Sequence, residues 1–86
     1  MDTNVIMHTD GTVTPVTPKK GTTYSLEELQ ALVGGYIELL PLEKNRYAVV
    51  NEEGMLHGLD LNPGASLLLG HSIVGPCVVI PRSSLR

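Results

Sequence analysis

Three histidines and one cysteine are the side chains best suited to bind a transition metal or to act as nucleophile and base. Zinc ligands typically occur in closely spaced pairs such as H-x-x-x-H or C-x-x-C. His8, His57, His71 and Cys77 form no such pair, and a single cysteine allows no internal disulfide. The sequence therefore predicts no metal site and no bound cofactor.

A hydrolytic triad can be assembled on paper from Ser66, His57 and Asp60. The chain contains no G-x-S-x-G elbow that would expose a serine nucleophile beside an oxyanion hole. Cys77 lies in the apolar run "CVVI", where a thiol usually behaves as a small buried hydrophobe. We therefore expect a protein that is not an enzyme.

An anion site is the other chemistry that the residue pattern allows. In "NPGAS", Asn62 fits the N-cap of a helix and Pro63 its first residue. The free N–H groups of such a helix start, together with Gly64, Ala65 and the hydroxyl of Ser66, could bind a small anionic ligand. An ordinary capped helix needs the same residue types, so both interpretations stand at this point.

Charge and composition exclude several classes of partner. Nine acidic and six basic residues give a formal net charge of -3, and the aromatic residues are three tyrosines. Nucleic-acid binders typically carry a basic surface with stacking aromatics, so no nucleic-acid partner is expected. No apolar run approaches the roughly 20 residues that span a membrane, and the start has no basic region of a secretion signal. We expect no membrane contact and a cytoplasmic location.

Three acidic residues have side chains of the type that binds cations, but their sequence context fits solvated surface better. Glu52 and Glu53 belong to "NEEG", which has the composition of a turn, and Glu38 lies in an expected strand. The sequence therefore assigns these carboxylates no ligand.

The stretch "YSLEELQALVGG" is the best-marked helix. Ser25 as N-cap and Glu28 three residues later form a capping box. Gly34 fits the left-handed residue that ends a helix, and Gly35 lets the chain turn into the next strand. The glycine pair follows the negative end of the helix dipole, which makes it unsuitable as a phosphate cradle. The residues predicted to share the core-facing side are Leu26, Leu29, Leu32 and Val33.

The N-terminal 22 residues are expected to form a hairpin and a loop. Strands over 4–8 and 12–16 flank Asp10 and Gly11, because Asp-Gly favours the positive φ that hairpin turns need. Pro15 cannot donate a ladder hydrogen bond, so its strand should lie at a sheet edge.

The remaining chain predicts a strand pair in "YIELLPL" and "YAVVN", then a further strand in "MLHGLDL" on which His57 faces water. A second short helix in "PGASLLLG" should end at Gly70, and "SIVGPCVVIP" should form a last strand interrupted at Gly75 and Pro76. Residues 1–86 thus predict one α+β domain. The expected elements follow the order β-β-α-β-β-(β)-α-β along the chain, and they form a small mixed or antiparallel sheet with two short helices.

Three blocks, "SLEELQALVGGYIELLPL", "VVNEEGMLHGLDLNPGASLLLG" and "IVGPCVVIP", resemble a small domain family of unknown function met in tailed-phage, prophage and plasmid-borne reading frames. The resemblance covers about residues 24–81, and L-x-x-L-Q-x-x-V-G-G-Y-I-E is its most specific part. It implies a short intracellular protein of a mobile genetic element. It supplies no catalytic residues.

From this context we expect a non-enzymatic binding protein that modulates a host protein or defence pathway. One alternative is a protein that sequesters a small molecule or nucleotide in a pocket at an oligomer interface, and another is an accessory enzyme. A small domain with exposed strand edges also predicts a homodimer, formed through the N-terminal hairpin or the C-terminal "VVI" strand.

Overall fold

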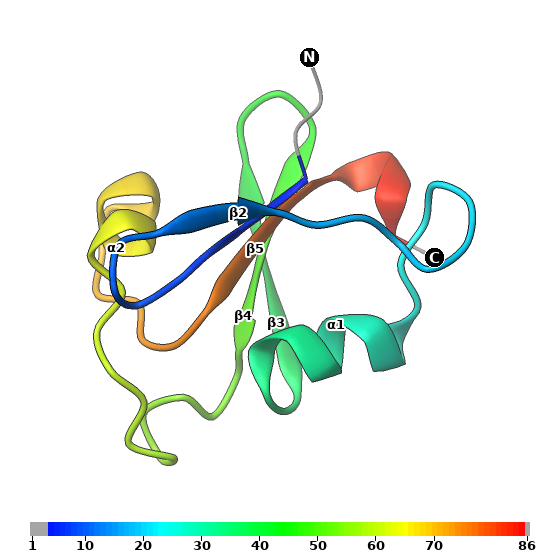
Figure 1. Cartoon of the computed structure of the whole chain (residues 1–86). Helices are drawn as coiled ribbons and strands as arrows, with labels where there is room; N and C mark the ends of the chain where they lie inside the picture. The colour runs from blue at the N-terminus through cyan, green and yellow to red at the C-terminus, as the bar shows by residue number, and fades with distance from the viewer. Residues whose placement is uncertain (1–3, 86) are drawn as a thin grey trace.

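A five-stranded antiparallel sheet with two short helices forms the domain, and this computed structural model describes residues 4–85 (Figure 1). The strand order is β2-β1-β5-β4-β3, which confirms the predicted α+β class. No helix in the described residues is long and apolar enough to cross a membrane. The elements in chain order are β1 (Val5–Met7), β2 (Val13–Pro15), α1 (Leu26–Val33), β3 (Ile37–Leu42), β4 (Arg46–Asn51), α2 (Pro63–Leu69), β5 (Cys77–Pro81) and a 3-10 turn, η1 (Arg82–Ser84).

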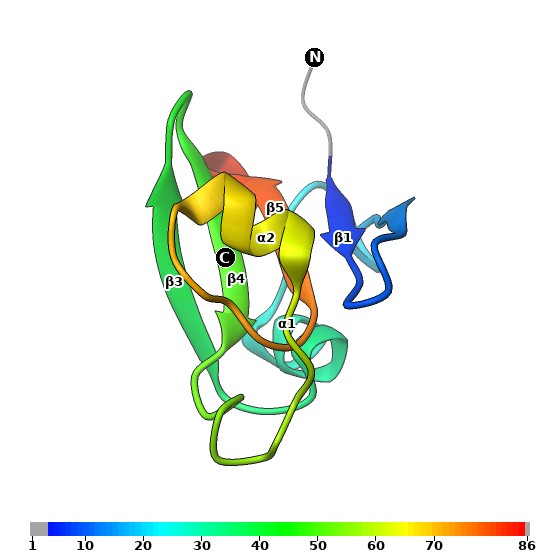
Figure 2. The ribbon, with the colours of Figure 1, turned by 90° about the vertical axis from the view of Figure 1, so that its left-hand side faces the viewer.

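Strand β5 lies at the centre of the sheet and is buried on both faces. Val78 and Ile80 pack in the cluster that α1 covers, whereas Cys77 and Val79 pack in the cluster on the α2 side. This split follows from the alternation of side chains along a strand. Helices α1 and α2 accordingly lie on opposite faces of the sheet (Figures 1 and 2).

The continuous apolar run of β5 therefore has the two-sided cover that the sequence predicts. The expectation that this strand offers an edge to a second copy was wrong. Strand β5 pairs with β1 on one side and with β4 on the other, so neither of its sides is an edge of the sheet. The sheet edges are β2 and β3.

The first helix begins and ends where the sequence predicts. Ser25 Oγ accepts a hydrogen bond from the Glu28 N–H at 3.2 Å, and Glu28 Oε1 accepts one from the Ser25 N–H at 3.0 Å. Leu29 and Val33 are buried, but Leu26 is 53% exposed, so its predicted place in the core was wrong. Helix α1 has only eight residues, and its buried residues are Leu29 and Val33, which lie about one turn apart.

The two glycines after α1 are required for different reasons. Gly34 has φ +82° and donates its N–H to the Gln30 carbonyl at 2.8 Å, which is the predicted left-handed helix end. Gly35 lies against β4, where an added Cβ would come within 3.0 Å of Asn51 Nδ2. One glycine thus serves backbone conformation and the other serves close packing.

We expect Gly34→Val to lower the free energy of unfolding by about 1–2 kcal/mol, because a β-branched residue is strained at positive φ. Asn tolerates the left-handed region, so Gly34→Asn should cost clearly less. Urea denaturation followed by circular dichroism measures both variants. Equal denaturation midpoints for wild type and Gly34→Val would contradict the role of Gly34 as a helix end.

Residues 52–58 form consecutive turns and residues 59–60 have no regular structure, so the strand predicted in "MLHGLDL" was wrong. His57 donates its N–H to the Glu53 carbonyl, and only Leu61 makes an isolated β-bridge, with Val74. Strand β4 already has β5 and β3 as neighbours, so no ladder position beside it is left for a further strand. Gly58 also has φ +67°, which breaks an extended run. The optional strand of the predicted order is absent, and His57 lies half-exposed on a turn.

The N-terminal hairpin forms as predicted, with a different turn. Gly11 donates its N–H to the His8 carbonyl, while the His8 N–H donates to the Thr12 carbonyl at 2.8 Å. Only Gly11 has positive φ, which is typical of a type I turn followed by a bulge. The hydroxyl and N–H of Thr12 both donate to Asp10 and lower the pKa of its carboxyl group.

Proline occupies an outward-facing backbone position on the β2 edge. Val16 donates its N–H to the Asn4 carbonyl at 2.9 Å, so the backbone groups of Val16 and Thr14 face β1. Pro15 therefore directs its nitrogen, which carries no hydrogen, away from the sheet. This confirms the predicted edge position of the Pro15 strand.

The β3 edge also carries a proline at an outward-facing backbone position. Glu52 donates its N–H to the Tyr36 carbonyl at 2.8 Å. Because the backbone groups of successive residues in β3 alternate between facing β4 and facing outward, the Pro41 nitrogen faces outward. Each open edge thus lacks one of the donors that an added strand would need. Proline at such positions protects a sheet from edge-to-edge pairing.

Candidate functional site

The four residues predicted to bind an anion come together at the start of α2. Asn62 is fully buried, and its Nδ2 donates to the Met7 carbonyl at 2.9 Å and to the Gly75 carbonyl at 2.8 Å. Its Oδ1 accepts a hydrogen bond from the Ala65 N–H at 3.1 Å. One side-chain amide therefore joins the end of β1, the first turn of α2 and the bend before β5.

The other predicted ligand groups are also used within the chain. Ser66 Oγ donates to the Asn62 carbonyl at 2.7 Å and accepts from the Ile73 N–H at 2.8 Å. Ala65 is buried, and a Cβ added to Gly64 would lie 2.8 Å from Met7 Cε. Anion binding at this helix start stays a prediction, and an anion there would compete with these hydrogen bonds. Gly70 ends the helix in the left-handed conformation, as predicted.

We expect Asn62→Ala to lower the free energy of unfolding by about 2–3 kcal/mol, since it removes a helix cap and leaves buried backbone groups unpaired. Asn62→Asp keeps the cap acceptor but directs a carboxylate at the carbonyls of Met7 and Gly75. The Asp variant should therefore also be destabilised. Chemical denaturation of both variants separates the contribution of the helix cap from that of the two hydrogen bonds donated by Nδ2. An Asp variant as stable as wild type would contradict a stabilising role of those two hydrogen bonds.

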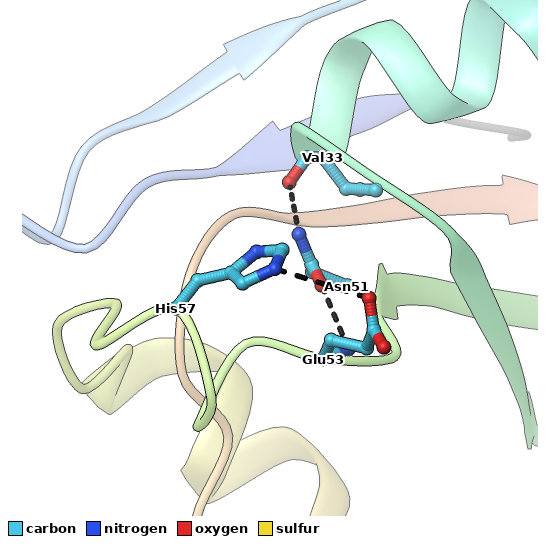
Figure 3. A network of polar contacts seen from close by, with 4 residues as sticks. All are labelled: Val33, Asn51, Glu53 and His57. Carbon is cyan, nitrogen blue, oxygen red and sulfur yellow. Dashed lines mark hydrogen bonds and ion pairs between the residues drawn. The ribbon is translucent and has the colours of Figure 1, made fainter.

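A second buried amide, Asn51, connects α1 to the turns after β4 (Figure 3). Its Nδ2 donates to the Val33 carbonyl at 3.1 Å, and its Oδ1 accepts the Glu53 N–H at 2.8 Å. His57 Nε2 lies 3.8 Å from Glu53 Oε1. Sequence reasoning missed Asn51. The available signal was a polar residue ending the apolar strand "YAVVN" at an inward-facing position.

The structure does not assemble the hypothetical triad. The hydroxyl of Ser66 bonds to the backbone of Asn62 and Ile73, whereas the ring of His57 contacts Glu53. Within residues 4–85, no group of three or more His, Cys, Asp or Glu side chains could hold a metal ion.

Cys77 is the first residue of β5 and is buried. Burial raises the pKa of its thiol from an ordinary 9.0 to about 11, because the thiolate would lose its hydration. The reactive species of cysteine is the thiolate, so the folded protein holds this residue in its unreactive form.

We expect Cys77 to react with iodoacetamide at pH 8 at least about a hundredfold more slowly in the folded protein than in urea. A pKa two units higher lowers the thiolate fraction by that factor, and burial blocks access further. Mass spectrometry over a time course measures the two rates. Equal rates under native and denaturing conditions would show that β5 is accessible to reagent.

A cavity of about 260 Å³ separates α1 from the chain that follows β2; we call it the α1 pocket. The apolar part of its lining is formed by Val16, Tyr24 and Leu32. Lys19 and Glu28 are the charged residues of the lining. A neighbouring cavity of about 300 Å³ shares Lys19 and Glu28 and adds Lys20, Ser25 and Glu27. Glu28 already accepts the backbone N–H groups of Ser25 and Lys19.

A smaller cavity of about 150 Å³ lies on the opposite face, between the β3–β4 pair and segment 71–74; we call it the β3–β4 pocket. Val50 and Ile73 are buried in its wall, and exposed Met55 contributes to its lining. Its charged and polar lining includes Glu38, Glu52, His71 and Ser72.

Large apolar side chains are exposed on α2 and on segment 52–61. Leu67 is 86% exposed and Leu56 is 82% exposed. Helix α2 lies in front of the sheet with segment 52–61 below it (Figure 2). We call the following side chains the α2 surface: Met55, Leu56, Leu61, Leu67 and Leu68.

These features define a small α+β domain with surface pockets and exposed apolar side chains. A family model described as a domain of unknown function, DUF3846, matches residues 3–84, and the chain belongs to this family. The match includes the N-terminal hairpin, which the sequence resemblance over 24–81 left outside. No curated protein and no solved structure matches the chain.

Proposed function

We propose that this domain is a non-enzymatic binding protein that contacts a protein partner through the α2 surface. The observation that carries the proposal is the concentration of exposed apolar side chains in residues 55–68. A small domain gains no stability from leucines such as Leu56 and Leu67 left in water. Exposed apolar patches are typical of protein interaction sites.

The sheet edges support contact through side chains rather than through strand addition. Pro15 and Pro41 each leave an outer backbone position without a donor. The expected homodimer would on this basis use the α2 surface as well, since β5 is enclosed in the sheet.

The biological setting of the proposal is a mobile genetic element acting in the host cytoplasm. It is supported by the resemblance of the "LVGGYIE" and "GLDLNPGASLLLG" blocks to reading frames of phages, prophages and plasmids. In that setting, the partner is a host protein, such as a component of a defence pathway, whose activity the bound domain modulates.

The test begins with affinity capture from host lysate and identification of the co-purified protein by mass spectrometry. Calorimetry with the purified partner should then show Kd raised about tenfold or more in a Leu56→Ala/Leu67→Ala double variant, as expected for apolar residues at an interface centre. Leu26→Ala removes an equally large exposed leucine from α1 on the other face and should leave Kd unchanged.

A partner that binds the double variant as tightly as wild type would overturn the assignment of the α2 surface. Light scattering of the isolated domain over a dilution series is the control for self-association, because a homodimer through the same surface would compete with the partner. In that case the double variant should also shift the measured mass toward one chain.

A small-molecule sequestering protein is the second candidate, and the α1 pocket favours it. Its volume of about 260 Å³ approaches the lower end of ligand pockets, about 300 Å³. Lys19 and Lys20 could face an anionic group, while Tyr24 and Leu32 contact an apolar one. This pocket lies within one chain rather than at an oligomer interface. Mass spectrometry of compounds extracted from the purified domain separates the two candidates, since a retained nucleotide would favour sequestration.

A further inference from the structure

We propose that the β3–β4 pocket receives a lysine or arginine side chain of the partner protein. The inference rests on the proposed protein-binding function and specifies what that partner must present. The pocket is lined partly by Met55, which also belongs to the α2 surface, so one partner could contact both.

The size of the pocket fits one long side chain. Small-molecule sites usually enclose about 300–1,000 Å³, whereas this cavity holds about 150 Å³. It is therefore too small for a typical metabolite and large enough for one extended side chain.

The walls suit the aliphatic part of such a side chain. Val50 and Ile73 are buried beneath the pocket, and the flexible thioether of Met55 is 79% exposed. Lysine and arginine commonly lay their methylene stems on apolar surface while the charged end remains in a polar environment.

Two carboxylates could receive the charged end. Glu38 is the cross-strand partner of Val50, and Glu52 follows Val50 by two residues, so strand alternation places both glutamates on the face of Val50. Within residues 4–85, neither carboxylate forms an ion pair or a side-chain hydrogen bond. Both glutamates are exposed and line the pocket, where a cationic group could form a charge-assisted hydrogen bond with either of them.

The distribution of charge along the chain favours a cationic occupant. Residues 47–81 contain three acidic side chains, Glu52, Glu53 and Asp60, and no lysine or arginine. Arg46 begins β4, six residues before Glu52 and about 20 Å away along an extended strand, beyond the screening length of about 8 Å at physiological salt. Among residues 4–85, no lysine or arginine lines the pocket, in which the imidazole of His71 is the one basic group beside the two glutamates, so complementary charge would select a basic partner residue.

The probe is a pair of blocked pentapeptides, Gly-Ser-Xaa-Ser-Gly, in which Xaa is arginine or the neutral arginine isostere citrulline. Titration of the isotope-labelled wild-type domain, followed by amide chemical shifts, should show saturable changes at Glu38, at residues 52–55 and at residues 71–74. The arginine peptide should produce them, salt should weaken them, and the citrulline peptide should not.

The variants Glu38→Gln and Glu52→Gln should each weaken binding of the arginine peptide by about twofold to fivefold, as expected for partly exposed ion pairs. Glu43→Gln removes the same charge at an exposed position in the β3–β4 turn, outside the pocket lining, and should leave the affinity unchanged. The wild-type peptide comparison needs no variant, so it decides the question even if a substitution disturbs folding.

Equal binding of the two peptides, binding of neither, or shifts confined to α1 would overturn the basic-residue assignment. Those outcomes would leave the proposed function standing, because that function is tested by the leucine variants of the α2 surface. Conversely, loss of the leucine effect with an intact arginine response would overturn the α2 surface alone.

Discussion

The burial of β5 on both faces is the constraint on which the rest of the fold depends. Five consecutive residues, Cys77–Pro81, are removed from water, so the chain must supply apolar cover on each side. Helix α1 supplies it on one face and α2 on the other. Strand β5 also joins the β1–β2 hairpin to the β3–β4 hairpin, which share no other ladder. The last strand in the sequence is thus the element that unites the sheet.

Two buried asparagines position the helices around this central strand. Asn51 holds the last carbonyl of α1 through Val33, while Asn62 holds the first turn of α2 and the backbone on both sides of it. In the described residues, no buried side-chain polar atom lacks a hydrogen-bond partner. Such fully paired amides fix geometry, because any displacement leaves a polar group buried without a partner.

The edges and the two faces of the sheet differ in their surface chemistry. The edges β2 and β3 each carry an outward-facing proline, so backbone pairing is discouraged there. Segment 52–61 and α2 instead expose leucines, and a nearby pocket has carboxylates in its lining. The opposite face has a larger pocket with two lysines nearby. The two faces of one sheet therefore differ in chemistry: one combines exposed leucines with carboxylates, and the other combines an apolar pocket with lysines.

The sequence by itself determined the local features: the capping box of Ser25 and Glu28, the left-handed Gly34, the Asp10-Gly11 hairpin and the edge position of Pro15. Each depends on groups a few residues apart, whose geometry the residue types restrict. Only the tertiary structure decided that β5 is central, that "MLHGLDL" forms turns, and that Glu38 and His71 line one pocket. Those outcomes depend on which strands pair across long sequence separations, and pairing is decided by the burial of whole faces rather than by any local pattern.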